Sequence, residues 1–438
     1  MTADRSALGW VAAGLAAFAL LPWYWQQDGS GLVHAASSGR TWLWIGPAGL
    51  LVCGVGRWRA RPGRWLLAGA LLGLIGLLGS GFAIGARGWA FESLARAFGD
   101  LPTGQFGIGL GGAVVLLALL VLLGAGIARL GFFRGDGFVA AAVVLCAALL
   151  LLFVALPVGK ALVGAFFDDT GTPSLGALAE RIGNERVWGL ACLAGGVRCG
   201  VAWNTLFVAL VVACGTTLLG SLLALLAERG PKRAARALNV LALLPIITPP
   251  FVVGLGLILL FGRAGLVNQA LEAVFAIAPT RWFYGANGIV LAQLFAFTPI
   301  AFMIMRGVVQ GIAPSLEEAA QTLRADAWTT FRSITLPLLK PGLTNAFLVG
   351  FIESIADFGN PIVVGGSFNV LSTDIFFAIV GAQFDQGKAA ALALILTAFA
   401  LAVFFLQQRL LGRARYTTVT GKGDAGMPMA LPDALRRL

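Results

Sequence analysis

Charged side chains are scarce in this sequence. Asp, Glu, Lys and Arg make up 12% of its 438 residues, whereas they make up about 25% of an average soluble domain. Hydrophobic residues reach 58%, which is more than a water-soluble core of this size needs. The shortage of charge argues against an ordinary soluble domain and predicts that the surrounding solvent is lipid. The 59 glycines fit close packing of membrane helices.

Histidine and the common catalytic motifs are equally scarce. The one histidine, His34, is expected in a loop without a chemical role. There is no HExxH motif, no Cys or His spacing typical of zinc and no serine–histidine set, so we expect no catalytic residues, no metal ligands and no cofactor. The segment GAQFDQGKAA contains Gly387 and Lys388 but lacks the spacing of a phosphate-binding loop, so the chain itself is not expected to bind ATP. An enzyme is therefore disfavoured.

The net charge and the cysteines bear on partners and compartment. The charge of +11 comes from basic residues in short loops between apolar runs, without the basic stripe and interleaved aromatics of a nucleic-acid-binding surface, so we expect no nucleic acid. Cys192 and Cys199 flank the polar segment LAGGVR, where either a local disulfide or two free thiols would fit. The other three cysteines lie in apolar runs and are expected to pack as small hydrophobes.

Long hydrophobic runs are abundant. A helix needs about 20 apolar residues to cross a bilayer. Ten runs predict an all-α polytopic integral membrane protein with about ten transmembrane helices, the first of them a retained helix rather than a cleaved signal peptide. The runs cover residues 8–25, 42–57, 65–86, 107–128, 138–163, 201–227, 237–261, 285–306, 343–364 and 389–408.

The distribution of Lys and Arg predicts the topology. With the N-terminus inside, the cytoplasmic segments hold about twice as many of the 31 basic residues as the outer segments, which favours a cytoplasmic N-terminus and C-terminus. The outer segments are short except for about 164–199. There SLGALAERIGNERVWGLACLAG is expected to form either an amphipathic helix on the outer membrane surface or a helix in a solvated loop.

One polar, helix-competent stretch lies between two apolar runs: SLEEAAQTLRADAWTTFRSITLPLLKPGL, at 315–343. Ser315 as a cap predicts a first short helix, and ADAWTTFRSITL predicts a second one, which Pro337 and Pro341 are expected to end. A few residues would suffice to join two spans, so a cytoplasmic helix–turn–helix indicates a docking surface for a partner. Candidates for the apolar side of the second helix are Trp328, Phe331 and Leu336.

This stretch resembles the cytoplasmic EAA loop of the membrane subunits of bacterial ATP-binding-cassette (ABC) importers. The family pattern is Glu-Ala-Ala, three residues, Gly, then about nine residues before an apolar-x-Leu-Pro. Arg324 stands at the glycine position, where a left-handed backbone would cost Arg on the order of 1 kcal/mol. Either the turn is built differently or Arg324 contacts the partner. By this resemblance the ATPase-coupling residues are Glu317, Glu318, Ala319, Ala320, Arg324, Ile334, Leu336 and Pro337.

The resemblance covers about residues 200–410 and favours the ferric-iron permease branch. WNTLFVALVVACGTTLLGSLLALLAERG resembles the first core helix, which we expect Asn204 and Thr205 to cap; LNVLALLPIITPPFVVGLGLILLFG resembles the next, and FIESIADFGNPIVVGG the helix after the loop. The resemblance implies a type I importer permease core of about five C-terminal helices. The expected division is an N-terminal extension of about five helices at 1–165, an external loop at 166–200, the permease core at 201–410 and a cytoplasmic tail or linker at 411–438.

The resemblance also implies partners and a mechanism. The loop would fit a groove on a cytoplasmic ATP-binding subunit, which would hydrolyse the ATP. An extracytoplasmic solute-binding protein would deliver the cargo, and a second permease half, as a homodimer or heterodimer, would complete the path. Such a subunit would lie in the bacterial cytoplasmic (inner) membrane.

Polar residues at membrane depth are the candidates for the translocation path, because ionisable groups there are costly. Glu353 and Asp357 are four residues apart and are expected on one helix face, followed by a kink at Asn360-Pro361. They either line a path for a cationic solute or form a packing network with basic residues or other helices. The prolines expected at a gate or a static kink are Pro245, Pro249 and Pro250.

Two alternatives stay open. The same family imports other solutes, so the cargo is alternatively a phosphonate, a polyamine, thiamine or an oxyanion. A secondary transporter driven by an ion gradient would show inverted repeats with broken helices at matched positions. The sequence shows neither clearly, and that function would leave the EAA-like stretch unexplained.

Overall fold

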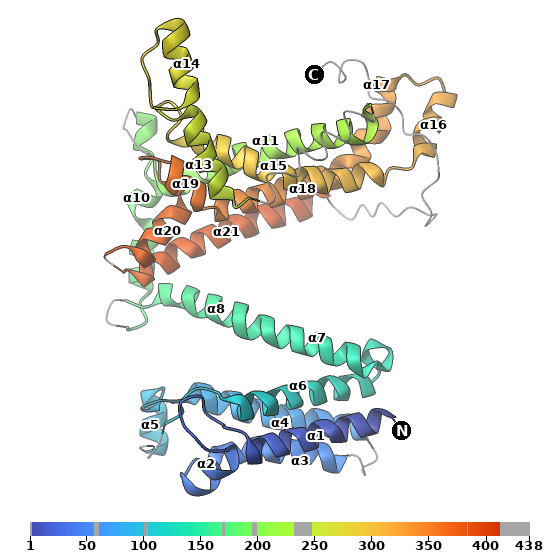
Figure 1. Cartoon of the computed structure of the whole chain (residues 1–438), viewed down its shortest axis with the longest axis vertical. Coiled ribbons are helices and arrows are strands. Elements are labelled where there is room, and N and C mark those ends of the chain that lie inside the picture. Colours follow the sequence, from blue (N-terminus) through green and yellow to red (C-terminus); the bar gives the residue numbers. More distant parts are fainter. Residues whose placement is uncertain are drawn as a thin grey trace. The chain divides into compact units, whose positions relative to one another are not determined.

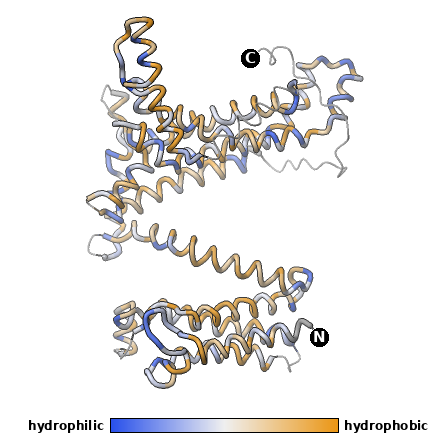
Figure 2. Tube along the Cα trace, in the orientation of Figure 1, coloured by the Kyte–Doolittle hydropathy of each residue, from blue (hydrophilic) through white to orange (hydrophobic). Residues whose placement is uncertain are grey.

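A computed structural model describes residues 2–56, 61–99, 101, 104–168, 171–194, 199–231, 248–382 and 384–411. It is built almost wholly from helices (Figure 1). Within these residues eight helical segments are long and apolar enough to cross a membrane. Two shorter apolar segments, Ser6–Leu20 and Thr41–Val55, overlap α1 (Thr2–Leu20) and α3 (Ile45–Val55). Hydrophobic residues follow the long helices in Figure 2. The predicted all-α polytopic membrane fold is confirmed.

The chain divides into two compact units, Met1–Val158 and Gly159–Leu438, which are described separately. Unit 1 contains one small antiparallel hairpin, in which β1 (Ile84–Gly85) pairs with β2 (Gly88–Trp89). Besides α1 and α3, its helices are α2 (Gly31–Ser37), η1 (Thr41–Trp44), α4 (Pro62–Ala83), α5 (Glu92–Phe98), α6 (Leu110–Arg129), η3 (Phe132–Gly135), α7 (Gly137–Leu150) and the π turn η4 (Leu151–Ala155). The helix α8 (Leu156–Val163) continues from η4.

Glycine holds two helices of unit 1 in close contact. A Cβ at Gly49 of α3 would lie 2.6 Å from the carbonyl oxygen of Gly69 in α4. No side chain fits there, so glycine permits the close backbone approach typical of membrane helices. Leu50, Leu119 and Leu122 are fully buried in the core of this unit.

The single histidine is not a loop residue as predicted. His34 lies in α2, whose first turn is capped by Ser30, and it is buried. Arg40 Nη1 donates a hydrogen bond to His34 Nδ1 at 2.9 Å, and the Arg40 guanidinium lies over the ring of Tyr24. Burial, together with the positive charge of Arg40, lowers the pKa of His34. The histidine is therefore a neutral acceptor for a buried arginine.

Unit 2 is organised around three long helices that pack on one another: α11 (Val201–Arg229), α15 (Ala286–Gln310) and α18 (Leu336–Ala356). A Cβ at Gly220 of α11 would lie 2.7 Å from the backbone nitrogen of Phe302 in α15, so these helices also approach closely. The other helices are η5 (Gly164–Phe166), α9 (Leu175–Gly183), α10 (Glu185–Trp188), η6 (Ala191–Ala194), α13 (Pro250–Phe261), α14 (Leu266–Phe275), α16 (Pro314–Thr322), α17 (Ala327–Thr330), η8 (Phe331–Thr335), α19 (Gly359–Val364), α20 (Leu371–Val380) and α21 (Gln386–Leu411).

The span expected at 343–364 has different ends. The helix runs unbroken from α17 through the π turn η8 into α18 and ends at Ala356, and α19 is a separate helix. The helix α20 was not predicted, because its ten residues are shorter than a bilayer span. The apolar length of a run thus located the membrane segment but not its breaks.

The start of α11 also differs from the prediction. Gly200 is the N-cap, so Asn204 and Thr205 lie inside the helix and do not cap it. Asn204 Nδ2 instead donates to the Asn369 carbonyl at 2.9 Å, and the backbone N–H of Leu371 donates to Thr205 Oγ1 at 2.8 Å. Both side chains therefore fix the start of α20 to α11.

The segment before α11 includes α9, which packs on other helices of unit 2. Leu178 and Ile182 of α9 pack against buried Ala391 of α21, so the apolar side of the helix faces its own unit. Cys192 and Cys199 form a disulfide with their Cα atoms 5.0 Å apart, which decides between the two alternatives for these thiols.

Candidate functional site

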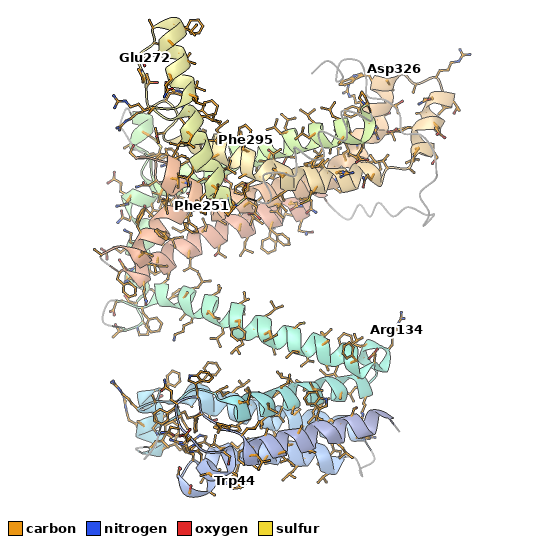
Figure 3. The ribbon with its side chains drawn as sticks, viewed as in Figure 1. Trp44, Arg134, Phe251, Glu272, Phe295 and Asp326 are labelled. Carbon is orange, nitrogen blue, oxygen red and sulfur yellow. A yellow bond between two sulfur atoms is a disulfide. The ribbon has the colours of Figure 1, made fainter. Side chains whose placement is uncertain are left out.

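The polar stretch folds into a hairpin of two short helices, α16 and α17, beyond one end of α11, α15 and α18 (Figure 1). Figure 3 shows Asp326 at the tip of this hairpin. The first helix begins at Pro314 with Ala313 as its N-cap, so the predicted cap at Ser315 is wrong. Proline suits the first helical position because its φ is fixed near the helical value and its missing N–H would have no partner there.

The turn after α16 is left-handed at the position where the family has glycine. Arg324 has a φ of +59°. Its N–H donates to the Gln321 carbonyl at 2.9 Å, and the N–H of Ala325 donates to the Ala320 carbonyl at 3.0 Å. These two bonds make a Schellman motif, which ends a helix by satisfying its last carbonyls. The turn is therefore built in the ordinary way, and arginine occupies a conformation that favours glycine.

The second helix begins with a side-chain cap. The Asp326 carboxylate accepts a hydrogen bond from the Thr329 N–H at 3.3 Å. Hydrogen bonding by Thr329 lowers the pKa of Asp326, because a donor stabilises the charged form of the carboxyl group. The tip of the hairpin therefore presents a carboxylate held at the start of α17.

The sequence predicts that the prolines after α17 end the helix, and this prediction is wrong. Pro337 lies in the first turn of α18 and Pro341 lies inside it. The π turn η8 ends two residues before Pro337. A proline ring clashes with the carbonyl four residues earlier in a regular helix, and the wider π turn shifts that carbonyl by one residue. The helix therefore continues from the hairpin into the membrane.

The hairpin has one exposed side. Glu318 and Ala319 are exposed, as is Arg324, and Leu323 has 84% of its surface accessible. Trp328 stacks on Phe331 and is 51% exposed, so of the expected apolar side only Phe331 packs against the core. Leu336 is likewise exposed and Ile334 and Pro337 are half-buried. A surface with exposed apolar and charged side chains side by side offers contacts to another protein.

Glu317 faces the opposite way. It is 1% exposed and its Oε1 lies 2.6 Å from Nη2 of Arg229, the last residue of α11. The same oxygen accepts a hydrogen bond from Thr335 Oγ1 in η8 at 2.8 Å. Glu317, one of the residues assigned to ATPase coupling, therefore holds the hairpin to the core and is not available on its surface. Ala320 is buried on the same side.

A second ion pair lies beside the first. Glu228, the residue before Arg229, accepts a hydrogen bond from Arg306 Nε at 2.6 Å and one from Gln310 Nε2 at 3.0 Å, both on α15. Two consecutive residues at the end of α11 thus bind α15 and the hairpin.

A polar break lies in the same unit between α18 and α19. Asp357 follows the last residue of α18, and its Oδ1 accepts the N–H of Gly359 at 3.0 Å and of Asn360 at 3.3 Å. Its Oδ2 accepts Asn360 Nδ2 at 2.8 Å and Gln293 Nε2 at 3.0 Å, and Ser354 Oγ donates to Gln293 Oε1 at 2.7 Å. The carboxylate therefore caps α19 and ties it to α15.

This geometry corrects two expectations. Asp357 lies outside the helix, so it does not share a helical face with Glu353, which is half-buried in α18. The break occurs at Asp357 and Phe358, before the Asn360-Pro361 pair where a kink was expected, because the Asp357 side chain caps a new helix. Asn360 is fully buried, and a Cβ at Gly254 of α13 would lie 2.7 Å from its Oδ1.

The prolines expected at a gate or kink lie at a helix start. Pro249 is the N-cap of α13 and Pro250 its first residue. Pro245 lies outside the described residues. The contact between Gly254 and Asn360 brings α13 directly against the polar break.

A charged cavity of about 380 Å³ lies at the end of unit 2 where Figure 1 draws α10 and α20, away from the hairpin. Asp374 of α20 is 5% exposed on its side chain, and its two oxygens accept Arg186 Nε at 3.0 Å and Nη2 at 3.2 Å. Glu180, Asp385 and Lys388 also line this cavity. Among the described residues no group of three or more His, Cys, Asp or Glu is placed to hold a metal ion.

The region that contains the hairpin and the break also matches a known family. The model for the binding-protein-dependent transport system inner membrane component matches residues 216–416. The molybdenum transport system permease protein ModB of Mycobacterium tuberculosis (strain H37Rv) is 32% identical over 236 residues, which cover 52% of this chain and 84% of that protein. The chain belongs to this permease family. It is accordingly a multi-pass membrane transport subunit of the inner-membrane type.

Two relatives are ferric transport permeases. The ferric transport system permease protein FbpB of Actinobacillus pleuropneumoniae is 39% identical over 324 residues, 74% of this chain and 45% of that protein. A putative ferric transport system permease protein, FbpB 1 of Haemophilus influenzae, is also 39% identical over 324 residues, and the match covers 49% of that protein. This permease thus spans about half the length of these relatives. The predicted resemblance to the ferric-iron branch is confirmed.

One solved structure has a similar fold. A chain of the crystal structure of a bacterial alginate ABC transporter, in complex with its alginate pentasaccharide-bound periplasmic protein, superposes with a TM-score of 0.52. The match covers 66% of this permease and all of that chain, at 17% sequence identity. The fold is therefore similar to that of a chain of an ABC transporter.

Sequence reasoning missed the residues that hold the hairpin and the break in place. Glu228 and Arg229 looked like ordinary charges at a helix end, and Gln293 and Ser354 like isolated polar residues in apolar runs. A glutamine inside a membrane span is itself a signal, because its amide needs partners in lipid. The identity of those partners comes only from the structure.

Proposed function

We propose that this permease is the membrane subunit of an ATP-driven importer and that its cargo is ferric iron. One observation carries the coupling role: the hairpin of α16 and α17 lies beyond one end of the core helices, and its Glu318 is exposed. The identity of 39% to two ferric transport permeases supports the cargo.

The proposed partners follow from the same geometry. A cytoplasmic ATP-binding subunit docks on the exposed side of the hairpin and hydrolyses the ATP. The hairpin then lies in the cytoplasm, together with both termini, and the charged cavity beside α20 faces an extracytoplasmic binding protein. A second permease half, identical or different, completes the transporter, which accords with relatives of about twice the length.

The proposed translocation path runs along the polar break. Glu353, Asp357 and Asn360 supply carboxylates and an amide at membrane depth, where such groups need a role or a partner. Pro249 and Pro250 start the helix that packs against Asn360, so they are the proposed gate elements, with Pro245. We retain the division proposed from the sequence, with a permease core at 201–410 preceded by an N-terminal extension at 1–165 and an external loop at 166–200.

The decisive experiment is ATPase stimulation in liposomes. The permease would be reconstituted with the ATP-binding subunit and the binding protein of its source, and ATP hydrolysis measured with ferric-loaded and with empty binding protein. Stimulation only by the ferric-loaded form is expected. Association without any ferric effect would reject iron and keep the importer, and a permease that associates with no ATPase would reject the importer.

One observation favours a second cargo. The two mycobacterial ModB relatives are matched over 84% of their length, more than the ferric relatives, although at the lower identity of 32%. An oxyanion such as molybdate is therefore the alternative. Stimulation by molybdate-loaded but not by ferric-loaded binding protein in the same liposomes would select it.

A further inference from the structure

We propose that Glu228 and Arg229, at the end of α11, form a junction that couples the hairpin to the membrane core, with the Arg229–Glu317 pair as its decisive contact. Glu317 is thereby a positioning residue for transport and not part of the surface that an ATPase touches. The inference rests on the proposed importer function, because the hairpin moves only if a partner moves it.

The two residues bind different elements because consecutive side chains on a helix point about 100° apart. Glu228 is directed to Arg306 and Gln310 on α15. Arg229 is directed to Glu317 on α16, which also accepts the Thr335 hydroxyl of η8. The end of α11 is thus joined directly to α15, the helix that leads into the hairpin, and to α16, and through Glu317 to η8.

The two ion pairs differ in burial. The side chains of Arg229 and Glu317 are 5% and 1% exposed, whereas those of Arg306 and Glu228 are 34% and 22% exposed. Breaking a buried pair leaves a charge without compensation, while a half-exposed charge regains water. The Arg229–Glu317 contact therefore fixes the position of the hairpin most strongly, and the Glu228 pair supports it.

The helix α11 carries that position across the membrane. It is 29 residues long, about 43 Å at 1.5 Å per residue. At its other end Asn204 and Thr205 bind the backbone of Asn369 and Leu371, directly before α20. A displacement of the hairpin is therefore passed through Arg229 to a rigid helix and on to the segment whose Asp374 lines the charged cavity.

The test is the coupling of ATP hydrolysis to loaded binding protein. Glu317→Gln keeps the size of the side chain and an oxygen for the Thr335 hydroxyl but removes the charge that Arg229 needs. We expect normal association with the ATPase and normal basal hydrolysis, with stimulation and uptake reduced on the order of tenfold, within the range of ordinary coupling between two sites. The charge exchange Glu317→Arg with Arg229→Glu is expected to restore part of the stimulation.

Controls separate coupling from folding. Glu272→Gln removes an exposed carboxylate from α14 and is expected to behave as the wild type (Figure 3). Thr335→Val keeps the ion pair, removes one hydrogen bond and is expected to reduce stimulation less than Glu317→Gln does. Should Glu317→Gln fail to fold, a reduced stimulation in Thr335→Val, with normal ATPase association, still supports the junction, and unchanged stimulation there rejects it.

The outcomes are distinguishable from failure of the proposed function. If the wild type associates and is stimulated but Glu317→Gln is stimulated equally, the junction is rejected and the importer stands. If Glu317→Gln loses ATPase association and stimulation together, the pair only shapes the docking surface and the coupling role is rejected. A wild type that no ATPase binds rejects the importer itself.

Discussion

The left-handed arginine in the hairpin turn gives the sharpest prediction on stability. Arg324 has a φ of +59°, a conformation that costs an L-residue roughly 1–2 kcal/mol, whereas glycine adopts it freely. Glycine also loses more backbone entropy on folding, which offsets part of the stability gained by relieving the strain. Arg324→Gly is therefore expected to stabilise the closed turn by about 1 kcal/mol, or about fivefold in its opening equilibrium.

Hydrogen exchange measures the opening equilibrium of the turn at Arg324 directly. The N–H groups of Arg324 and Ala325 close the Schellman motif, so a peptide that covers both reports opening of the turn. After correction for intrinsic exchange rates, we expect about fivefold slower exchange in Arg324→Gly. Arg324→Ala keeps a Cβ and the strained φ, and is expected to exchange like the wild type.

The result that would refute this reasoning is protection by alanine as strong as by glycine, or no protection by glycine. The first would show that the guanidinium, and not the backbone, destabilises the turn. A separate outcome concerns the partner: weaker ATPase association in both variants, with the turn intact, would mean that Arg324 is kept because it contacts the ATPase.

The remaining predictions concern the docking surface, the polar break and the disulfide. Glu318→Lys reverses an exposed charge and is expected to abolish ATPase association and uptake while the permease stays in the membrane; retained co-purification and uptake would mean that the hairpin is not the docking site. Glu353→Gln with Asp357→Asn is expected to impair uptake without loss of assembly, and unchanged uptake would assign these acids to packing alone. Replacing Cys192 and Cys199 by serine opens a short loop and is expected to cost about 2 kcal/mol, seen as a lower melting temperature, and an unchanged temperature would contradict it.

The parts of the fold that follow from hydrophobic length could be predicted from the sequence. The long helices match apolar runs because a bilayer requires about 20 apolar residues whatever they pack against. The hairpin followed from a polar, helix-competent stretch between such runs. The missing glycine singled out Arg324, but its left-handed φ comes only from the structure. The prediction failed for α20, which is too short to give that signal.

The orientation of neighbouring glutamates could not be predicted. Glu317 and Glu318 are adjacent in a helix of nine residues, and such a short segment has too few apolar positions to define its inner face. The buried one is selected by Arg229 and Thr335, which lie far from it in the sequence. A resemblance to a loop pattern therefore located the docking element but not which of its carboxylates faces the partner.

Two irregularities that were not predicted from the sequence lie at the two ends of α18, in the continuous helix formed by α17, η8 and α18. The π turn η8 precedes Pro337 at the hairpin end of α18, and the polar break at Asp357 follows its other end. Between them α18 packs against α11 and α15; Glu228 joins these two helices to each other, and Arg229 joins α11 to the hairpin. Regular propensity rules fail where a sequence trades local stability for function. The π turn precedes Pro337 within this continuous helix, so a movement of the hairpin has two routes into the core: through α18 to the break, and through α11 to the start of α20.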